Sequence, residues 1–107
     1  MKQRPQLLPE YDVPTALEAL AHALASLKTA EEVHAFLEDL CTPAELESMA
    51  DRWKVVPLLL QGVPYREVHD RTAVSVTTIG RVARTMDRGT GGYATAARRL
   101  RLPLDSH

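Results

Sequence analysis

The sequence has little cysteine and few aromatic residues: Cys41 is the only cysteine, and tryptophan and phenylalanine occur once each. A single cysteine excludes an internal disulfide and a zinc site built from several cysteines. The longest apolar run, residues 55–60, is far shorter than the roughly 20 residues of a membrane-spanning helix. No basic stretch followed by a long apolar segment opens the chain, as a secretory signal would. We therefore expect a cytoplasmic protein that makes no contact with a membrane.

The usual elements of catalytic and metal sites are missing as well. Two histidines four residues apart would place two metal ligands on one helix face, but no two histidines have this spacing. The glycines at 89–92 do not match the pattern of a phosphate-binding loop. The sequence therefore predicts that the protein is not an enzyme, binds no metal and requires no cofactor.

Charge is divided unequally along the chain. Residues 1–64 hold 5 Lys/Arg and 10 Asp/Glu, a balance of −5, whereas residues 65–101 hold 8 Arg and 3 Asp/Glu, a balance of +5. A basic half beside an acidic half suggests a polyanionic partner, although a solvated basic surface would show the same balance. Arginine favours the first interpretation, because its planar group of donors suits phosphates and base edges.

The length of 107 residues is enough for one domain with a modest core, which dimerisation often supplements. Three prolines and little periodicity predict a flexible N-terminal arm over residues 1–14. Apolar residues then recur with helical spacing over residues 15–103, which predicts an all-α domain. About six helices are expected, at residues 15–27, 30–40, 43–61, 64–71, 75–87 and 93–102.

Three local features qualify these helices. Thr42, Pro43 and Glu45 form a strong start signal for the third helix. Pro57 should bend that helix or end it early, because it removes a backbone hydrogen bond at a cost of roughly 3 kcal/mol. Since the apolar period continues through Leu60, the helix is kept and a bend is expected near residues 53–57. Residues 74–79 are rich in β-branched side chains and could form a strand, but they would have no partner strand, so a helix is favoured.

Residues 64–88 have the pattern of a helix-turn-helix, in which a short helix and a tight turn set a second helix into the major groove of DNA. Ser75 is a good N-cap for the second helix, and the early positions on its outer side are small. The turn holds Ala73 where glycine is usual, Pro64 is a poor cap for the first helix, and His69 occupies a position that often holds a small residue. The side chains expected to form the small core between the two helices are Val68, Thr72, Val74 and Ile79.

A polar stripe runs along the outer face of the second helix, because Thr77, Arg81, Arg84 and Arg88 are spaced at i, i+4, i+7 and i+11. Three arginines without an acid on one stripe favour DNA over plain solvent as its partner. The alternative is a helical protein–protein interaction module that binds acidic partner helices and no operator.

Five separate pieces of the chain resemble the Trp repressor superfamily, and most closely its YerC/YecD-type branch. They are residues 40–53 (LCTPAELESMADRW), 58–62 (LLLQG), 65–68 (YREV), 78–82 (TIGRV) and 88–93 (RGTGGY), with LKTAEE at 27–32 in support. The resemblance implies an intertwined homodimer with six helices per chain. Its two recognition helices would lie about 34 Å apart and read a near-palindrome in duplex DNA.

The resemblance also implies site residues and raises the question of a ligand. Carried over by position, the DNA-binding residues are Arg66, Ser75, Val76, Thr77, Thr78, Gly80, Arg84 and Arg88. Arg52 and Arg81 match the arginines that hold tryptophan in the Trp repressor, and Thr42 matches another pocket residue. Val82 stands where that protein has glycine and should narrow the cleft, so tryptophan is not expected. The implied function is a sequence-specific transcriptional regulator, a repressor, with either no corepressor or a different small aromatic one.

Overall fold

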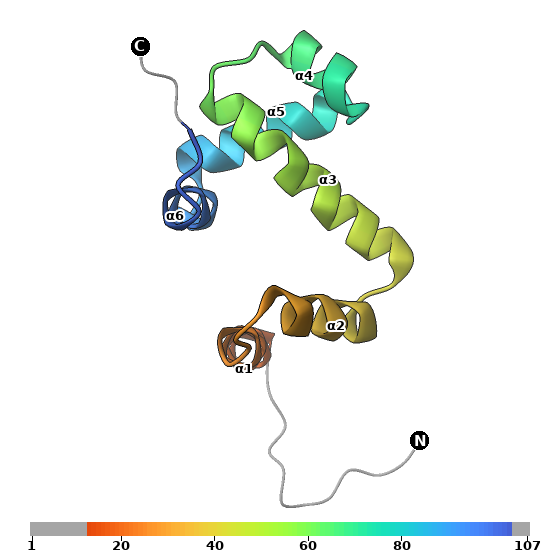
Figure 1. Ribbon diagram of the computed structural model, residues 1–107, viewed down its shortest axis with the longest axis vertical. Helices are drawn as coiled ribbons and strands as arrows, with labels where there is room; N and C mark the ends of the chain where they lie inside the picture. The colour runs from red at the N-terminus through yellow and green to blue at the C-terminus, as the bar shows by residue number, and fades with distance from the viewer. Residues whose placement is uncertain (1–12, 104–107) are drawn as a thin grey trace, which may run out of the picture. The chain divides into compact units, whose positions relative to one another are not determined.

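The computed structural model describes residues 13–103, which form six helices and no strand (Figure 1). The all-α prediction is confirmed, and the expected helix ends lie within three residues of the observed ones. Most of the expected arm lies outside the described residues, but its last two residues begin the first helix. The helices are α1 (Val13–Ala25), α2 (Ala30–Leu40), α3 (Pro43–Leu60), α4 (Tyr65–Thr72), α5 (Val76–Arg88) and α6 (Gly92–Arg99).

The chain divides into two compact units, residues 1–40 and residues 41–107, and each is described by itself. The first unit contains α1 and α2, and the second contains α3 to α6. None of the side chains at positions 14–40 is buried. Leu17 and Leu40 are 64% and 51% exposed, so the apolar faces of α1 and α2 remain largely open to solvent.

Side chains cap the starts of α2 and α3. Thr42 Oγ1 accepts the backbone N–H of Glu45 at 3.1 Å, and the Glu45 carboxylate accepts the N–H of Thr42 at 2.8 Å, which completes the expected capping box. At α2, Thr29 Oγ1 accepts the N–H of Glu32 at 3.0 Å. The sequence pattern Thr29–Glu32 also predicts a capping box, but the Glu32 carboxylate accepts the N–H of Lys28, not that of Thr29, at 2.7 Å.

Helix α3 continues through Pro57 to Leu60, so the proline does not end it early. Val55 and Val56 are completely buried, and Leu58 to Leu60 pack against the same cluster. This burial offsets the backbone hydrogen bond that proline removes. Gly62 follows the end of the helix, and its φ of 77° suits glycine. The N–H groups of Gly62 and Val63 donate to the carbonyls of Leu59 and Leu58, respectively.

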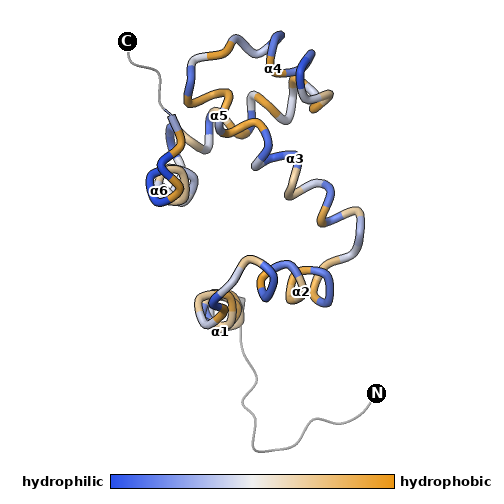
Figure 2. Tube along the Cα trace, viewed as in Figure 1, coloured by the Kyte–Doolittle hydropathy of each residue, from blue (hydrophilic) through white to orange (hydrophobic). Residues whose placement is uncertain are grey.

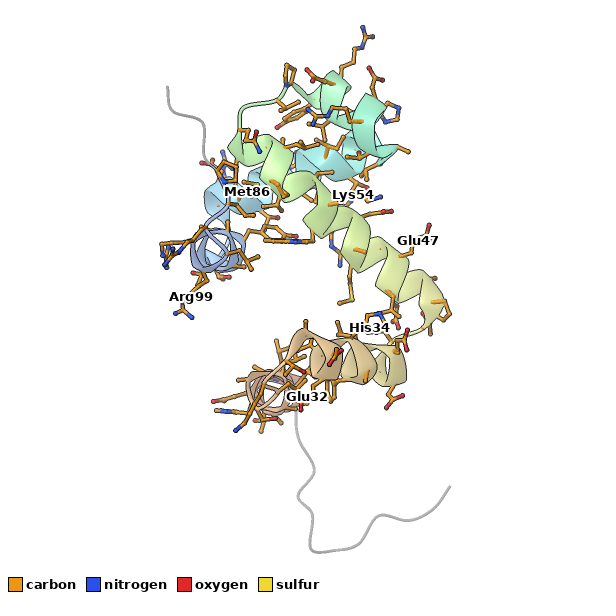
Figure 3. All side chains as sticks on the ribbon, in the orientation of Figure 1. Glu32, His34, Glu47, Lys54, Met86 and Arg99 are labelled. Carbon is orange, nitrogen blue, oxygen red and sulfur yellow. The ribbon has the colours of Figure 1, made fainter. Side chains whose placement is uncertain are left out.

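The core of the second unit lies where α3, α4 and α5 pack together. Figure 2 shows the hydrophobic segments of α3 and α5 meeting where these helices cross. Trp53 and Tyr93 join α6 to α3, with ring centroids 6.2 Å apart and ring planes inclined by 37°; Figure 3 shows the side chains of α6 and of α3 extending into the space between these two helices. The buried cluster consists of Val55, Val56, Val68, Val74, Ile79 and Val82.

The link between α5 and α6 contains a glycine that the packing requires. A Cβ added to Gly89 would lie 2.6 Å from the carbonyl oxygen of Thr85 and 2.9 Å from its Cγ2. The Gly89 N–H donates to that carbonyl at 2.7 Å, which keeps the two backbones close. A side chain at this position would therefore force the end of α5 to move.

Candidate nucleic-acid interface

Helices α4 and α5 form the helix-turn-helix that the sequence predicts, with residues 73–75 as the turn. Val68 of α4 and Ile79 of α5 are completely buried, and Val74 of the turn is 4% exposed. Thr72, the fourth residue expected in this small core, is half-buried. The apolar sides of the two helices thus pack against each other inside the motif, and the outer side of α5 faces solvent.

Side chains of α4 hold the turn in place. Ala73 is in the left-handed region with φ 65°, as its position in the motif requires. Thr72 Oγ1 donates to the carbonyl of Val68 at 2.7 Å and accepts the N–H of Val74 at 3.1 Å. His69 Nδ1 lies 2.7 Å from the carbonyl oxygen of Val74, which can only accept, so Nδ1 is the donor.

The start of α5 is fixed by the N-cap that the sequence predicts. Ser75 Oγ accepts the backbone N–H of Thr78 at 3.1 Å and lies 3.0 Å from Thr78 Oγ1, to which it can donate. This cap orients the first turn of α5. At α4, Pro64 provides no side-chain cap, as expected.

The outer face of α5 carries exposed arginines, and only one of them, Arg88, lies near a carboxylate in the described structure. Arg88 lies 3.9 Å from Asp87, and both side chains are at least 80% exposed, so this contact is weak. Arg81 and Arg84 make no ion pair within residues 13–103, and neither does Arg66 on α4. Arg81, Arg84 and Arg88 line one shallow hollow together with Thr85 and Gly89. The structure thus brings the three predicted arginines of α5 together.

The leading residues of α5 present small and apolar groups. Val76 is 52% exposed, Thr77 is exposed and Gly80 is half-exposed. Tyr65, at the start of α4, is 45% exposed, and its Cε2 lies 3.9 Å from where a Cβ on Gly80 would be. No sequence signal marks Tyr65 as part of this surface, because its proximity to Gly80 depends on the angle between the two helices.

The residues expected to form a ligand pocket have different surroundings in the structure. Val82 is 1% exposed and belongs to the core cluster. Arg52 is half-buried and donates to Ser48 Oγ at 3.0 Å, whereas Arg81 is exposed on α5. Thr42 caps α3 ten residues before Arg52, about 15 Å away along the helix.

Neither a metal centre nor a membrane span is present in the described part of the chain. Residues 13–103 contain no group of three or more His, Cys, Asp or Glu side chains that could hold a metal ion. No helix in the same range is both long and apolar enough to cross a membrane.

Comparisons with known proteins agree with this geometry. Residues 15–101 match the family model for the Trp repressor protein. The chain is 36% identical over 85 residues to the uncharacterized protein YerC of Bacillus subtilis (strain 168), and the match covers 79% of this chain and 82% of that one.

Two solved structures are similar over most of their length. One is a proposed Trp repressor from Staphylococcus aureus, with a TM-score of 0.79 and 31% identity over 84% of this chain and 90% of that one. The other is a TrpR-like protein from Eubacterium eligens ATCC 27750, with a TM-score of 0.76 and 36% identity over 81% and 90% of the two chains. The chain therefore belongs to the Trp repressor family of helix-turn-helix DNA-binding regulators.

Proposed function

We propose that this protein is a homodimeric, sequence-specific transcriptional regulator, acting as a repressor, that places α5 in the major groove of duplex DNA. The observation that carries this proposal is the division of α5 into two sides. Ile79 and Val82 are buried in the motif, and the opposite side presents the arginines Arg81, Arg84 and Arg88 without a neighbouring carboxylate except Asp87. A helix that is apolar inside and basic outside, with small leading residues, fits a groove bordered by phosphates.

The open apolar faces support the homodimer. Residues 14–40 have no buried side chain, although α1 and α2 carry apolar stripes. Leu17, Leu40, Met49 and Leu100, all outside the helix-turn-helix, are between 37% and 64% exposed. Exposed apolar surface of this extent marks association surfaces. A symmetric dimer would bury it and present two copies of α5 to one duplex.

We also propose that DNA binding needs no corepressor. An aromatic ring held between Arg52 of α3 and Arg81 of α5 needs open space between these helices. Val82, next to Arg81, instead packs into the cluster that contains Val55 and Val56 of α3. If a small aromatic ligand modulates the protein, it would have to be smaller than an indole or displace this side chain.

The proposal is tested by the dependence of duplex binding on salt. Lysine and arginine contacts to phosphates release counterions, so log K should fall by about 0.9 for each tenfold increase in salt and each phosphate bound. Binding to random duplex DNA is measured at two salt concentrations, without any added small molecule. A protein that binds no duplex at low salt would refute the proposed function, and binding that requires an added aromatic compound would refute the corepressor proposal.

Arg84 provides the matched test on the protein side. Arg84→Ala should weaken duplex binding and lower the salt slope by about 0.9 for each phosphate that the variant no longer binds. It should not change thermal stability, because Arg84 is exposed and makes no ion pair within residues 13–103. Lys28→Ala, an equal change in charge outside the helix-turn-helix, is the control. An unchanged affinity in Arg84→Ala would show that this residue does not touch the DNA.

A further inference from the structure

Two large apolar side chains of the helix-turn-helix remain in solvent although its core is complete. Tyr65 is 45% exposed and Val76 is 52% exposed, whereas Val68 and Ile79 are completely buried. The other large exposed hydrophobic side chains in the described structure lie outside the motif. The fold of the motif therefore does not account for Tyr65 and Val76.

These two side chains lie along one apolar strip on the motif. Val76 and Gly80 are one turn apart on the same face of α5. Gly80 has no side chain, and Tyr65 Cε2 lies in ordinary van der Waals range of its Cβ position, at 3.9 Å. Tyr65 also lines a shallow hollow with Ala83 of α5. We call Tyr65, Gly80 and Val76 the apolar strip.

Unpaired positive charge borders the apolar strip. Arg66 follows Tyr65 on α4, and Arg81 follows Gly80 on α5. Neither forms an ion pair within residues 13–103. Arg84 lies one turn beyond Gly80 on α5, and it also forms no ion pair in this range. An apolar strip between unpaired arginines matches the major groove, where phosphates flank a floor whose apolar group is the C5-methyl of thymine.

The first two turns of α5 offer few polar side chains for reading bases, namely Thr77 and Arg81. They contain no Asn or Gln, the residues that make paired hydrogen bonds to adenine. Ser75 and Thr78 have their hydroxyls engaged with each other at 3.0 Å. Besides the Thr77 hydroxyl and the Arg81 guanidinium, apolar contact is therefore the means by which this part of the helix can distinguish one base from another.

We propose that the apolar strip reads thymine methyl groups, so that each half-site of the preferred DNA has a thymine facing Tyr65 and Val76. This inference rests on the proposed function and adds the chemical class of base that the site selects. The two can be tested separately, because salt-dependent binding to duplex DNA does not depend on thymine methyls.

The experiment removes the methyl groups without changing base pairing. Duplexes are selected from random sequence by the full-length protein, and each thymine is then replaced singly by uracil. Burial of a methyl group contributes roughly 0.8 kcal/mol, so at least one replacement per half-site should weaken binding about fourfold. The neighbouring replacements serve as controls within the same duplex.

Variants of the apolar strip then assign the effect to its residues. Val76→Ala should reduce the fourfold sensitivity to uracil to nearly none at the position that Val76 contacts. Tyr65→Phe keeps the ring and should keep the sensitivity, whereas Tyr65→Ser should abolish it. Both positions are exposed, and circular dichroism is expected to show folded variants.

The outcomes separate this inference from the proposed function. If binding depends on salt but no replacement of thymine by uracil weakens it, only this inference is overturned. Sensitivity that persists unchanged in Val76→Ala and Tyr65→Ser overturns the assignment to the apolar strip. If the protein binds no duplex at low salt, before uracil is introduced, both the proposed function and this inference are overturned. A surface that binds another protein instead of DNA would give this result.

Discussion

His69 Nδ1 lies 2.7 Å from the carbonyl oxygen of Val74, so a side chain of α4 is hydrogen-bonded to the turn that precedes α5. The bond spans the left-handed residue Ala73 and links α4 to the residue before the Ser75 cap. His69 thus helps to hold the angle between α4 and α5, although the sequence alone marked it only as an unusual residue at the crossing.

His69→Leu should lower the free energy of unfolding by about 1 kcal/mol, the usual contribution of one such hydrogen bond. His69→Asn should retain most of the stability, because its amide nitrogen can occupy nearly the place of Nδ1 and donate to Val74. Urea denaturation followed by circular dichroism, at one fixed protein concentration, measures both variants. Equal stability of His69→Leu and the parent protein would show that the bond contributes nothing.

Ala73→Gly should stabilise the protein. Ala73 has φ 65°, a conformation that costs a residue with a Cβ roughly 1–2 kcal/mol, and glycine adopts it without that cost. Glycine is also more flexible in the unfolded chain, which offsets part of this stabilisation, so the expected net increase is about 0.5–1 kcal/mol.

Ala50→Gly is the control for that substitution, because Ala50 is an exposed residue inside α3. There the same change should destabilise by about 1 kcal/mol. Both are compared by their midpoints in urea at equal protein concentration. If Ala73→Gly were the less stable of the two variants, the left-handed conformation of Ala73 would be contradicted.

Gly89→Ala and Gly92→Ala form a second matched pair. A Cβ on Gly89 would lie 2.6 Å from the Thr85 carbonyl oxygen, so the substitution should destabilise by roughly 1–3 kcal/mol as the end of α5 moves. A Cβ on Gly92 meets nothing within 4 Å, and Gly92→Ala should be neutral or slightly stabilising. Thermal unfolding distinguishes them, and equal melting temperatures would contradict the close approach at Gly89.

Much of the fold was readable from the sequence, because its signals are local. The Thr42–Glu45 box fixes the start of α3, Ser75 fixes the start of α5, and helical spacing identifies Val68 and Ile79 as buried. The continuation of α3 through Pro57 was also expected, because the helical spacing of apolar residues runs on to Leu60.

The site was readable in part. The arginine stripe follows from spacing alone, and the structure places Arg81, Arg84 and Arg88 around one hollow. The approach of Tyr65 to Gly80 joins residues 15 positions apart across the turn, and only the angle between the helices creates it. Val82, by contrast, follows Ile79 at helical spacing on the apolar side of α5, and both are buried.

Sedimentation velocity should show a dimer at micromolar concentration, because the apolar stripe of α1 is not buried by other described residues and a second copy of the chain would cover it. Leu17 is 64% exposed on this stripe. Leu17→Glu should therefore shift the protein toward monomer, since the interface would have to bury a carboxylate. Ala19→Glu places the same charge on the opposite face of α1, at an exposed position, and should leave the dimer intact. A monomeric parent protein would contradict the proposed dimer, and equal effects of the two variants would show that the Leu17 face is not its interface.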